Sequence, residues 1–285
     1  MKLRNTSSLL IFSLLIGCGE RGGNGENHPD TTSSAVVIRQ ADPKVDALFA
    51  NVDANDGWYG VYIQGTKSGY AHIQLKDLRE SDSPTVEMEM NMVLETKVGD
   101  DVLQITNSHI EQFDGVPPYR LLRSATMTKS RDEVEKIEIR QASSGNNYNV
   151  RIEQGGATRT EKFDAAYTLL DASRSTLWVL GGPEAGDTCE QKSLDVTRLA
   201  ISSDHYRIKE KKRGRFNGVE ISYYVIATTI GEMTFDVVIL ADGTPVKMVM
   251  GEAFEMRLEA ENVAKALDRP RDLFVDNVVP AEGNF

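Results

Sequence analysis

The two cysteines, Cys18 and Cys189, are the residues of this sequence best suited to covalent chemistry. A cysteine nucleophile acts as a thiolate, which needs a nearby histidine and a positive local field. Asp204 and His205 follow Cys189 along the chain, but Cys189 itself lies in Gly-Asp-Thr-Cys-Glu-Gln, where acids on both sides disfavour the thiolate. We therefore expect a free structural or surface cysteine at position 189, with a Cys189–His205 enzyme as the less favoured alternative.

Cys18 follows a short targeting segment. Lys2 and Arg4 precede an apolar run, Leu9–Ile16, which is far shorter than the roughly 20 residues that span a bilayer but has the length of a signal-peptide core. The ending Leu-Ile-Gly-Cys resembles the bacterial lipobox, in which the cysteine is diacylated and becomes the mature N-terminus. We predict a lipoprotein signal peptide over residues 1–17 and lipidation at Cys18, which leaves Cys189 without a disulfide partner in the chain. The alternative is an ordinary secretory signal with an incidental cysteine.

Histidines and carboxylates supply the other candidates for chemistry. His72 falls on the polar side of an expected strand and His109 is similar, so both are predicted at the surface, with ligand contact as the alternative. Glu87, Glu89 and Glu111 could supply paired carboxylates for acid–base catalysis. Alternation with apolar residues instead places Glu87 and Glu89 on a solvated strand face.

The net charge of the chain limits the classes of molecule that it can bind. The 285 residues carry 32 Lys+Arg against 43 Asp+Glu, a net charge of −11, and phosphate-backbone binding needs a basic stripe. The one basic cluster, Lys209–Arg213 with Arg215, is expected at a hairpin tip, with contact to phosphate, lipopolysaccharide or a peptidoglycan carboxylate as the alternative. Two cysteines and four scattered histidines offer no set of metal ligands. We predict no nucleic-acid partner, no metal and no cofactor.

Methionines mark one strand face. Between Val86 and Leu94 every second residue is apolar and the residues between are polar except Val93, which predicts a half-buried antiparallel strand. Later strands add further methionines to the same concave side of a curved sheet. This face is either plain core or an adaptable groove for an acyl chain or apolar peptide. Its predicted members are Met88, Met90, Met92, Met248, Met250 and Met256.

The elements that position these residues are mostly strands, broken by glycine-rich and Asx-rich turns. Helical spacing occurs over Ala165–Leu180, Val45–Phe49 and Glu259–Leu267. The predicted strands are 58–63, 70–75, 86–94, 102–113, 120–128, 134–142, 148–153, 158–163, 188–194, 205–211, 219–229, 233–240, 246–250 and 254–258.

The predicted architecture is mainly β, with curved antiparallel sheets, a central connecting helix and short terminal helices. The sheets form either two related halves or a half-barrel. The predicted organisation is a tether over 18–44 that starts at the lipidated cysteine, one β-rich domain over 45–268 with possible halves 58–164 and 186–258, and a polar tail over 269–285.

The first strand pair carries a family resemblance. Trp58–Tyr62, Gly65, Lys67 and Gly69–His72 resemble the motif that opens the β-rich region of bacterial exported transglutaminase-like proteins. The second strand series is similar to the later part of that region, on the following segments: Gly186-Asp187, Ser193–Asp195, Asn217-Gly218, Asp242–Lys247 and Glu259–Ala266.

In that family the Cys-His-Asp catalytic core lies after this region, and the sequence ends at Phe285. The resemblance thus implies the non-catalytic β part alone and carries over no catalytic residue. We expect a lipid-anchored protein of the bacterial envelope, facing the periplasm or cell surface from the outer membrane, with a binding or scaffolding domain. The alternatives are a carrier of lipid or another apolar ligand in a half-barrel and, less favoured, a cysteine-dependent transglutaminase- or protease-like enzyme.

Overall fold

The computed structural model describes residues 42–50, 55–98, 101–131, 133–143, 145–216, 218–251, 253–267 and 279–280. The predicted signal peptide, Cys18 and the tether up to residue 41 lie outside the described residues. The signal peptide, the lipidation and the tether therefore remain predictions. None of the described helices is long and apolar enough to cross a membrane.

Two series of strands make up most of the chain, as the alternation patterns predict. The first comprises β1 (Asp56–Ile63), β2 (Thr66–Leu78), β3 (Thr85–Val98), β4 (Asp101–Asp114), β5 (Leu121–Ser130), β6 (Glu133–Gln141), β7 (Asn147–Gln154) and β8 (Ala157–Asp164). The second comprises β9 (Thr188–Asp195), β10 (Ala200–Phe216), β11 (Val219–Ile230), β12 (Met233–Leu240), β13 (Pro245–Met250) and β14 (Phe254–Glu259). The mainly β prediction is confirmed.

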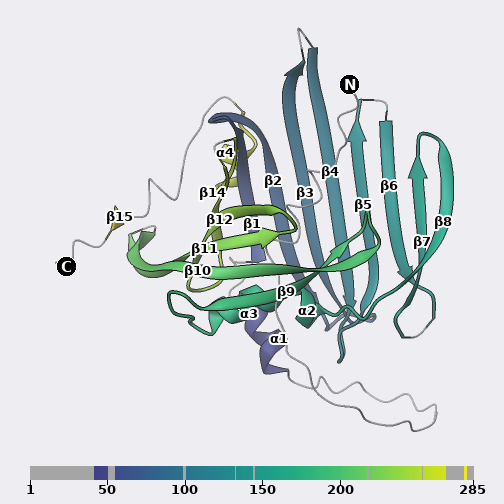
Figure 1. Cartoon of the computed structure of the whole chain (residues 1–285), viewed down its shortest axis with the longest axis horizontal. Coiled ribbons are helices and arrows are strands. Elements are labelled where there is room, and N and C mark those ends of the chain that lie inside the picture. The colour runs from purple at the N-terminus through teal and green to yellow at the C-terminus, as the bar shows by residue number, and fades with distance from the viewer. Residues whose placement is uncertain are drawn as a thin grey trace.

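Both series belong to one antiparallel sheet. Each is a meander of sequential hairpins, and β14 pairs with β1, so the order runs β10-β11-β12-β13-β14-β1-β2-β3-β4-β5-β6-β7-β8 with β9 alongside β10 (Figure 1). The sheet is not closed into a barrel, because β8 and β9 have no described partner on their outer sides. The two predicted halves are therefore two consecutive meanders joined edge to edge.

The predicted central helix is divided into two short helices, α2 (Leu169–Ala172) and α3 (Arg174–Leu180). Thr168 caps α2 through a reciprocal capping box with Asp171, which fixes the start of this turn of helix. A single residue, Ser173, separates the two helices. α1 (Pro43–Leu48) agrees with the predicted N-terminal helix.

Besides shifts of strand ends, three predictions differ from the structure. Glu259 ends β14, and the closing helix α4 is shorter, over Glu261–Ala264. The basic run Lys209–Arg213 is not a hairpin tip, since β10 continues through it and pairs with β11 on both sides of a register shift at Lys209. In the predicted polar tail, Val279–Pro280 forms β15 against β10.

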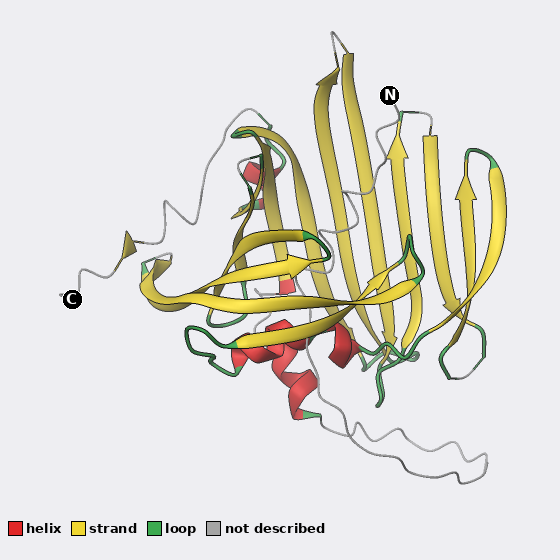
Figure 2. Ribbon diagram, in the orientation of Figure 1, coloured by secondary structure: helices red, strands yellow, loops and turns green. Residues whose placement is uncertain are grey.

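The sheet curves so that the second meander covers the inner face of the first. One core cluster joins α1, β3–β8, α2 and β9. A second joins β1–β3 with α3 and β10–β14. In the view of Figures 1 and 2, β9–β11 run across the ribbons of β3–β5, with α1–α3 below β9. The inner face is thus a packed interior, whereas the outer face of β4–β7 faces away from it.

Candidate binding site

The residues of the family-like motif meet at the junction of the two meanders. Lys67 Nζ lies 2.6 Å from Glu259 Oε2, and the two side chains are 1% and 0% exposed. Tyr62 donates to the other oxygen of Glu259 at 2.5 Å, and Lys67 also donates to the carbonyl of Val263 in α4 at 2.5 Å. A buried ion pair of this kind needs every charge and proton matched. The motif therefore positions a structural contact between β1, β2 and β14.

Two glycines of the motif allow close packing, Gly60 against Glu259 and Gly69 against the backbone of β3. A Cβ at Gly60 would lie 2.4 Å from Glu259 Oε2, and one at Gly69 would lie 2.0 Å from the carbonyl oxygen of Val93. Both distances are far below van der Waals contact, so a side chain at either position would displace its neighbour.

Trp58 and His72, the aromatic residues of the motif, also have structural partners. Their rings stack at 3.9 Å, while Lys265 lies over the Trp58 ring at 4.2 Å. His72 Nε2 lies 2.6 Å from Asp56 Oδ1 on the outer face. This position agrees with the prediction that His72 lies on the polar side of its strand. Because His72 and Lys265 occupy the indole, it offers little surface to a ligand.

The predicted methionine face lies on the inner side of the sheet and is packed. Met88, Met90, Met92, Met248 and Met256 are 1–3% exposed. Met250 is partly buried against the second core cluster. The arrangement agrees with the plain-core alternative at these residues, and the groove alternative would require the two meanders to separate.

Next to the methionines, the inner face of β4 is polar. His109 pairs with Met90 across β3 and β4, and Glu111 pairs with Met88, so both share the methionine face. They are 2% and 1% exposed, and the predicted surface position of His109 is wrong. By contrast Glu87 and Glu89 lie on the outer face, where both contact Lys76.

The buried polar residues of β4 are connected to one another. His109 Nδ1 lies 2.6 Å from Thr126 Oγ1, and its Nε2 lies 3.5 Å from Glu111 Oε1. Tyr167 donates to the second oxygen of Glu111 at 3.4 Å. Burial, and then the negative charges of Glu111 and Asp171, raise the pKa of Tyr167 well above its usual value, so Tyr167 stays a hydrogen-bond donor.

Asp204 on β10 faces the same interior from the second meander. It is fully buried, and among the described residues neither carboxylate oxygen has a hydrogen bond of ordinary geometry. Burial raises the pKa of Asp204 to about 7, against a smaller opposing effect of Ser193. The Ser193 hydroxyl itself lies 2.8 Å from that of Ser202. Sequence alone gives no signal for this group, since Asp204 sits in an ordinary polar stretch.

Cys189 is disulfide-bonded in the structure, so the prediction of a free cysteine at this position is wrong. It pairs in register with Tyr206, while His205 pairs with Glu190. Neighbouring strand positions point to opposite faces, so Cys189 and His205 do not form a catalytic pair here. Two lysines of the basic run of β10 form ion pairs: Lys209 contacts Asp236 at 2.8 Å and Lys211 contacts Glu184 at 2.5 Å.

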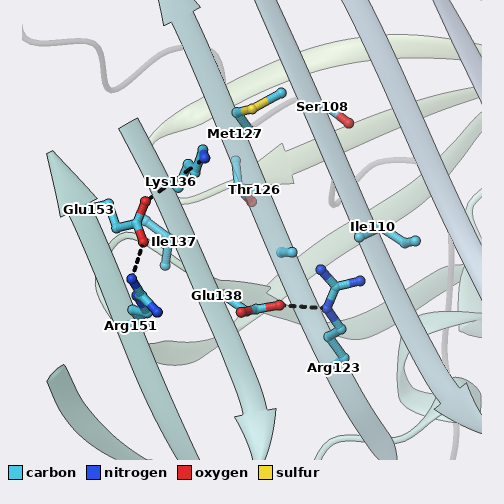
Figure 3. Close-up of a pocket in the computed structure, with 11 residues that line it drawn as sticks. Ser108, Ile110, Arg123, Thr126, Met127, Lys136, Ile137, Glu138, Arg151 and Glu153 are labelled. Carbon is cyan, nitrogen blue, oxygen red and sulfur yellow. Dashed lines mark hydrogen bonds and ion pairs between the residues drawn. The ribbon is translucent and has the colours of Figure 1, made fainter. Parts of the chain in front are cut away.

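The outer face carries a hollow of about 380 Å³ over β4–β7 (Figure 3). Its outer-face lining combines small and apolar residues with three cations and two acids. The lining side chains of this face are Ser108, Ile110, Arg123, Ala125, Met127, Lys136, Glu138, Arg151 and Glu153. We name this feature the outer hollow.

Ion pairs organise the rim of the outer hollow. Arg123 Nε lies 2.7 Å from Glu138 Oε1, and Arg151 lies 2.7 Å from Glu153 (Figure 3). Lys136 is 3.9 Å from Glu153. Arg140 and Arg123 lower the pKa of Glu138, so its carboxylate stays charged. The alternation of β5 and β6 did not single out these residues, because the hollow depends on which side chains become neighbours across strands.

Within the described residues, no group of three or more His, Cys, Asp and Glu side chains is placed to hold a metal ion. Comparison of the chain with protein-family models, with curated proteins and with solved structures found no match.

Proposed function

We propose that this chain is a lipid-anchored binding protein of the bacterial envelope, without catalytic activity, and that the outer hollow is its ligand site. The observation that carries the proposal is the contrast between the two faces of β4–β7. The inner face is filled by core side chains, whereas the outer face holds a concave, mixed apolar and charged site. Ligand sites combine these features: concavity, apolar area and a few oriented polar groups.

The envelope location rests on the signal-peptide pattern and on Cys18. Two attached acyl chains give stable membrane anchoring, whereas one gives only marginal binding. Labelling of cells with radioactive palmitate should mark the wild-type chain and leave a Cys18→Ala variant unmarked. An unlabelled wild-type chain, or one that retains residues 1–17, would remove the anchor from the proposal.

The state of Cys189 sharpens this test. The sequence has two cysteines, and one sulfur cannot be both a thioether and half of a disulfide. Lipidation of Cys18 therefore excludes the disulfide that the structure gives Cys189, and the proposed lipoprotein carries Cys189 as a free thiol. The intact mass of the extracted protein, with and without reduction and alkylation, distinguishes a diacylated chain with one alkylatable cysteine from an internally oxidised chain.

The binding role is tested by native mass spectrometry of the full chain extracted from its own envelope. A ligand of the outer hollow should appear as an added mass that disappears in an Ala125→Leu variant, because the larger side chain fills the site. A chain that carries no added mass under gentle extraction, and binds no envelope component, would contradict a binding role.

A carrier of apolar ligands on the inner face is the second candidate. It is favoured by buried polar atoms that have no hydrogen bond within the described part of the chain, such as Ser124 Oγ and both oxygens of Asp204. An amphiphile with a donor head group would satisfy these atoms if the meanders separated. In that case the added mass would be apolar and would survive Ala125→Leu.

A further inference from the structure

We propose that the outer hollow binds a monocarboxylate with a compact apolar body, held by the guanidinium of Arg123 and seated on Ala125. This inference names the ligand class of the site in the proposed function and therefore rests on it. The relevant juxtaposition is one small side chain, Ala125, with apolar neighbours on two sides and with an arginine beside it; among the described residues that arginine donates one side-chain hydrogen bond, from Nε to Glu138.

Ala125 forms the floor. It pairs with Ile110 across β4 and β5, and with Glu138 across β5 and β6. Along β5 its neighbours on the same face are Arg123 and Met127, two positions away in each direction. A single methyl group among four long side chains leaves a depression at this point, and the lining of the hollow agrees with that position.

The floor and one wall are apolar. Ile110 and Met127 flank Ala125, and Met127 is 41% exposed, which is a large share for a hydrophobic side chain in the middle of a strand. Burial of this surface under an apolar group would contribute roughly 25 cal/mol per Å² removed from water. Methionine also adapts its shape to different partners. These contacts favour a branched or cyclic apolar body over a fully polar ligand.

Arg123 provides the anion contact. Its Nε donates to Glu138, and Figure 3 shows the rest of the guanidinium turned away from Glu138 toward Ile110. A guanidinium presents five donors in a planar fork that matches a carboxylate with two parallel hydrogen bonds. The ion pair with Glu138 uses one edge of this fork and fixes its orientation.

The rim charges limit the ligand to a single negative charge. Arg123, Lys136 and Arg151 stand against Glu138 and Glu153, so the lining carries one net positive charge in a chain of net charge −11. One added carboxylate brings the lining to neutrality; Arg140, which contacts Glu138 at 2.8 Å, lies outside the lining. A dianion such as a phosphate monoester would place excess negative charge beside both glutamates, which costs free energy.

The test uses the full chain in lipid nanodiscs with ¹³C-labelled methionine methyl groups. The sequence has nine methionines. Met127 reports on the outer hollow, while Met88 and Met90 report on the inner face. Met127→Leu assigns the first signal. N-acetyl-leucine is the probe, and N-acetyl-leucinamide is its neutral match. Inorganic phosphate tests the charge argument.

We expect N-acetyl-leucine to shift the Met127 signal saturably, with a Kd in the range of about 0.1–10 mM that is usual for so small a ligand. The signals of Met88 and Met90 should stay in place. The amide should bind at least tenfold more weakly, and phosphate should not compete. Arg123→Gln should also weaken binding at least tenfold, and Ala125→Leu should abolish it.

Arg159→Gln in β8 is the matched control, since Arg159 pairs with Glu161 outside the hollow and its loss should leave the affinity unchanged. Unshifted Met88 and Met90 signals in each variant verify the fold. Equal affinity for the acid and the amide, or unchanged affinity in Arg123→Gln, would overturn the ligand class. If a neutral or dianionic envelope molecule is nevertheless displaced by Ala125→Leu in native mass spectrometry, the proposed function stands while this inference fails.

Discussion

Two carboxylates, Glu259 and Asp204, are both buried in this sheet, but they differ in their hydrogen-bond partners. Glu259 has Lys67 and Tyr62 on its two oxygens. Asp204 is just as inaccessible, yet its oxygens have no hydrogen bond of ordinary geometry among the described residues. The first carboxylate joins the two meanders edge to edge through β14 and β1. The second lies where one meander covers the other.

The comparison separates two ways of placing polarity in a core. A matched buried ion pair is stable only while both partners are present. If one partner is removed, the remaining charge is buried with neither a counter-charge nor water to solvate it. An unmatched buried acid is tolerated by keeping its proton, which makes its contribution depend on pH. The edge-to-edge junction should therefore be sensitive to mutation, and the packing of one meander over the other should be sensitive to pH.

The largest effect is expected for Lys67→Met. The substitution removes the cation but keeps much of the side-chain volume, so Glu259 is left charged and buried beside Tyr62. We expect a loss of about 3–5 kcal/mol in the free energy of unfolding, measured by urea denaturation monitored by tryptophan fluorescence.

A second substitution tests the explanation. In Lys67→Met/Glu259→Leu both charges are absent, and a large part of the lost stability should return because apolar replacement of a buried pair is often neutral. If the double variant is no more stable than Lys67→Met, packing rather than charge matching explains the loss.

The pH dependence of stability should follow Asp204. Burial raises its pKa from 3.8 to about 7, so between these values the folded chain holds a proton that the unfolded chain releases. The contribution of Asp204 to stability is therefore fully present below pH 4 and is lost as the pH rises to about 7. Three pKa units correspond to at most about 4 kcal/mol.

Asp204→Asn isolates this contribution from all other titrating groups. The difference in unfolding free energy between the variant and the wild type should grow from pH 4 to pH 7 in favour of the variant and then level off. A difference that is constant with pH would show that Asp204 ionises freely in the folded chain, and the contrast with Glu259 would disappear.

A smaller loss is expected for Gly60→Ala. The new methyl carbon would lie 2.4 Å from Glu259 Oε2, so the carboxylate must move away from Lys67. Overpacking of this kind costs about 1–3 kcal/mol. Thermal unfolding of Gly60→Ala in the Glu259→Leu background is the control, since the penalty should change once the carboxylate is absent; an unchanged penalty would assign it to the backbone.

The sequence could predict the strands but not these contacts. The alternation from Val86 to Leu94, broken at Val93, gives β3 one apolar face, and the sequence predicts this strand with shorter bounds than Thr85–Val98. The pattern of β4 has no such face, because Ile110 lies on one side and Phe113 on the other. Only the register with Met88 and Met90 places Glu111 and His109 inside. Strand register and the curvature of the sheet are long-range properties.

The candidate sites depend on the same long-range information. Lys67 and Glu259 are separated by most of the described chain, and their contact follows from the pairing of β1 with β14. The outer hollow exists because Ala125 is flanked by Ile110 and Glu138 from neighbouring strands. The motif around Trp58 identified the region of Lys67 but not its role, which is structural in the described part of the chain.

The smallest effect is expected for Lys209→Met, which repeats the chemistry of Lys67→Met at an exposed ion pair. Lys209 and Asp236 lie 2.8 Å apart, but their side chains are 47% and 41% exposed. Water and salt solvate Asp236 once the lysine is gone, so the change in unfolding free energy should stay below about 1 kcal/mol and shrink in 0.5 M salt. The same urea titration measures both lysine variants side by side. If Lys209→Met costs as much as Lys67→Met, distance rather than burial sets the strength of ion pairs in this sheet, and the contrast between matched and unmatched buried charge loses its basis.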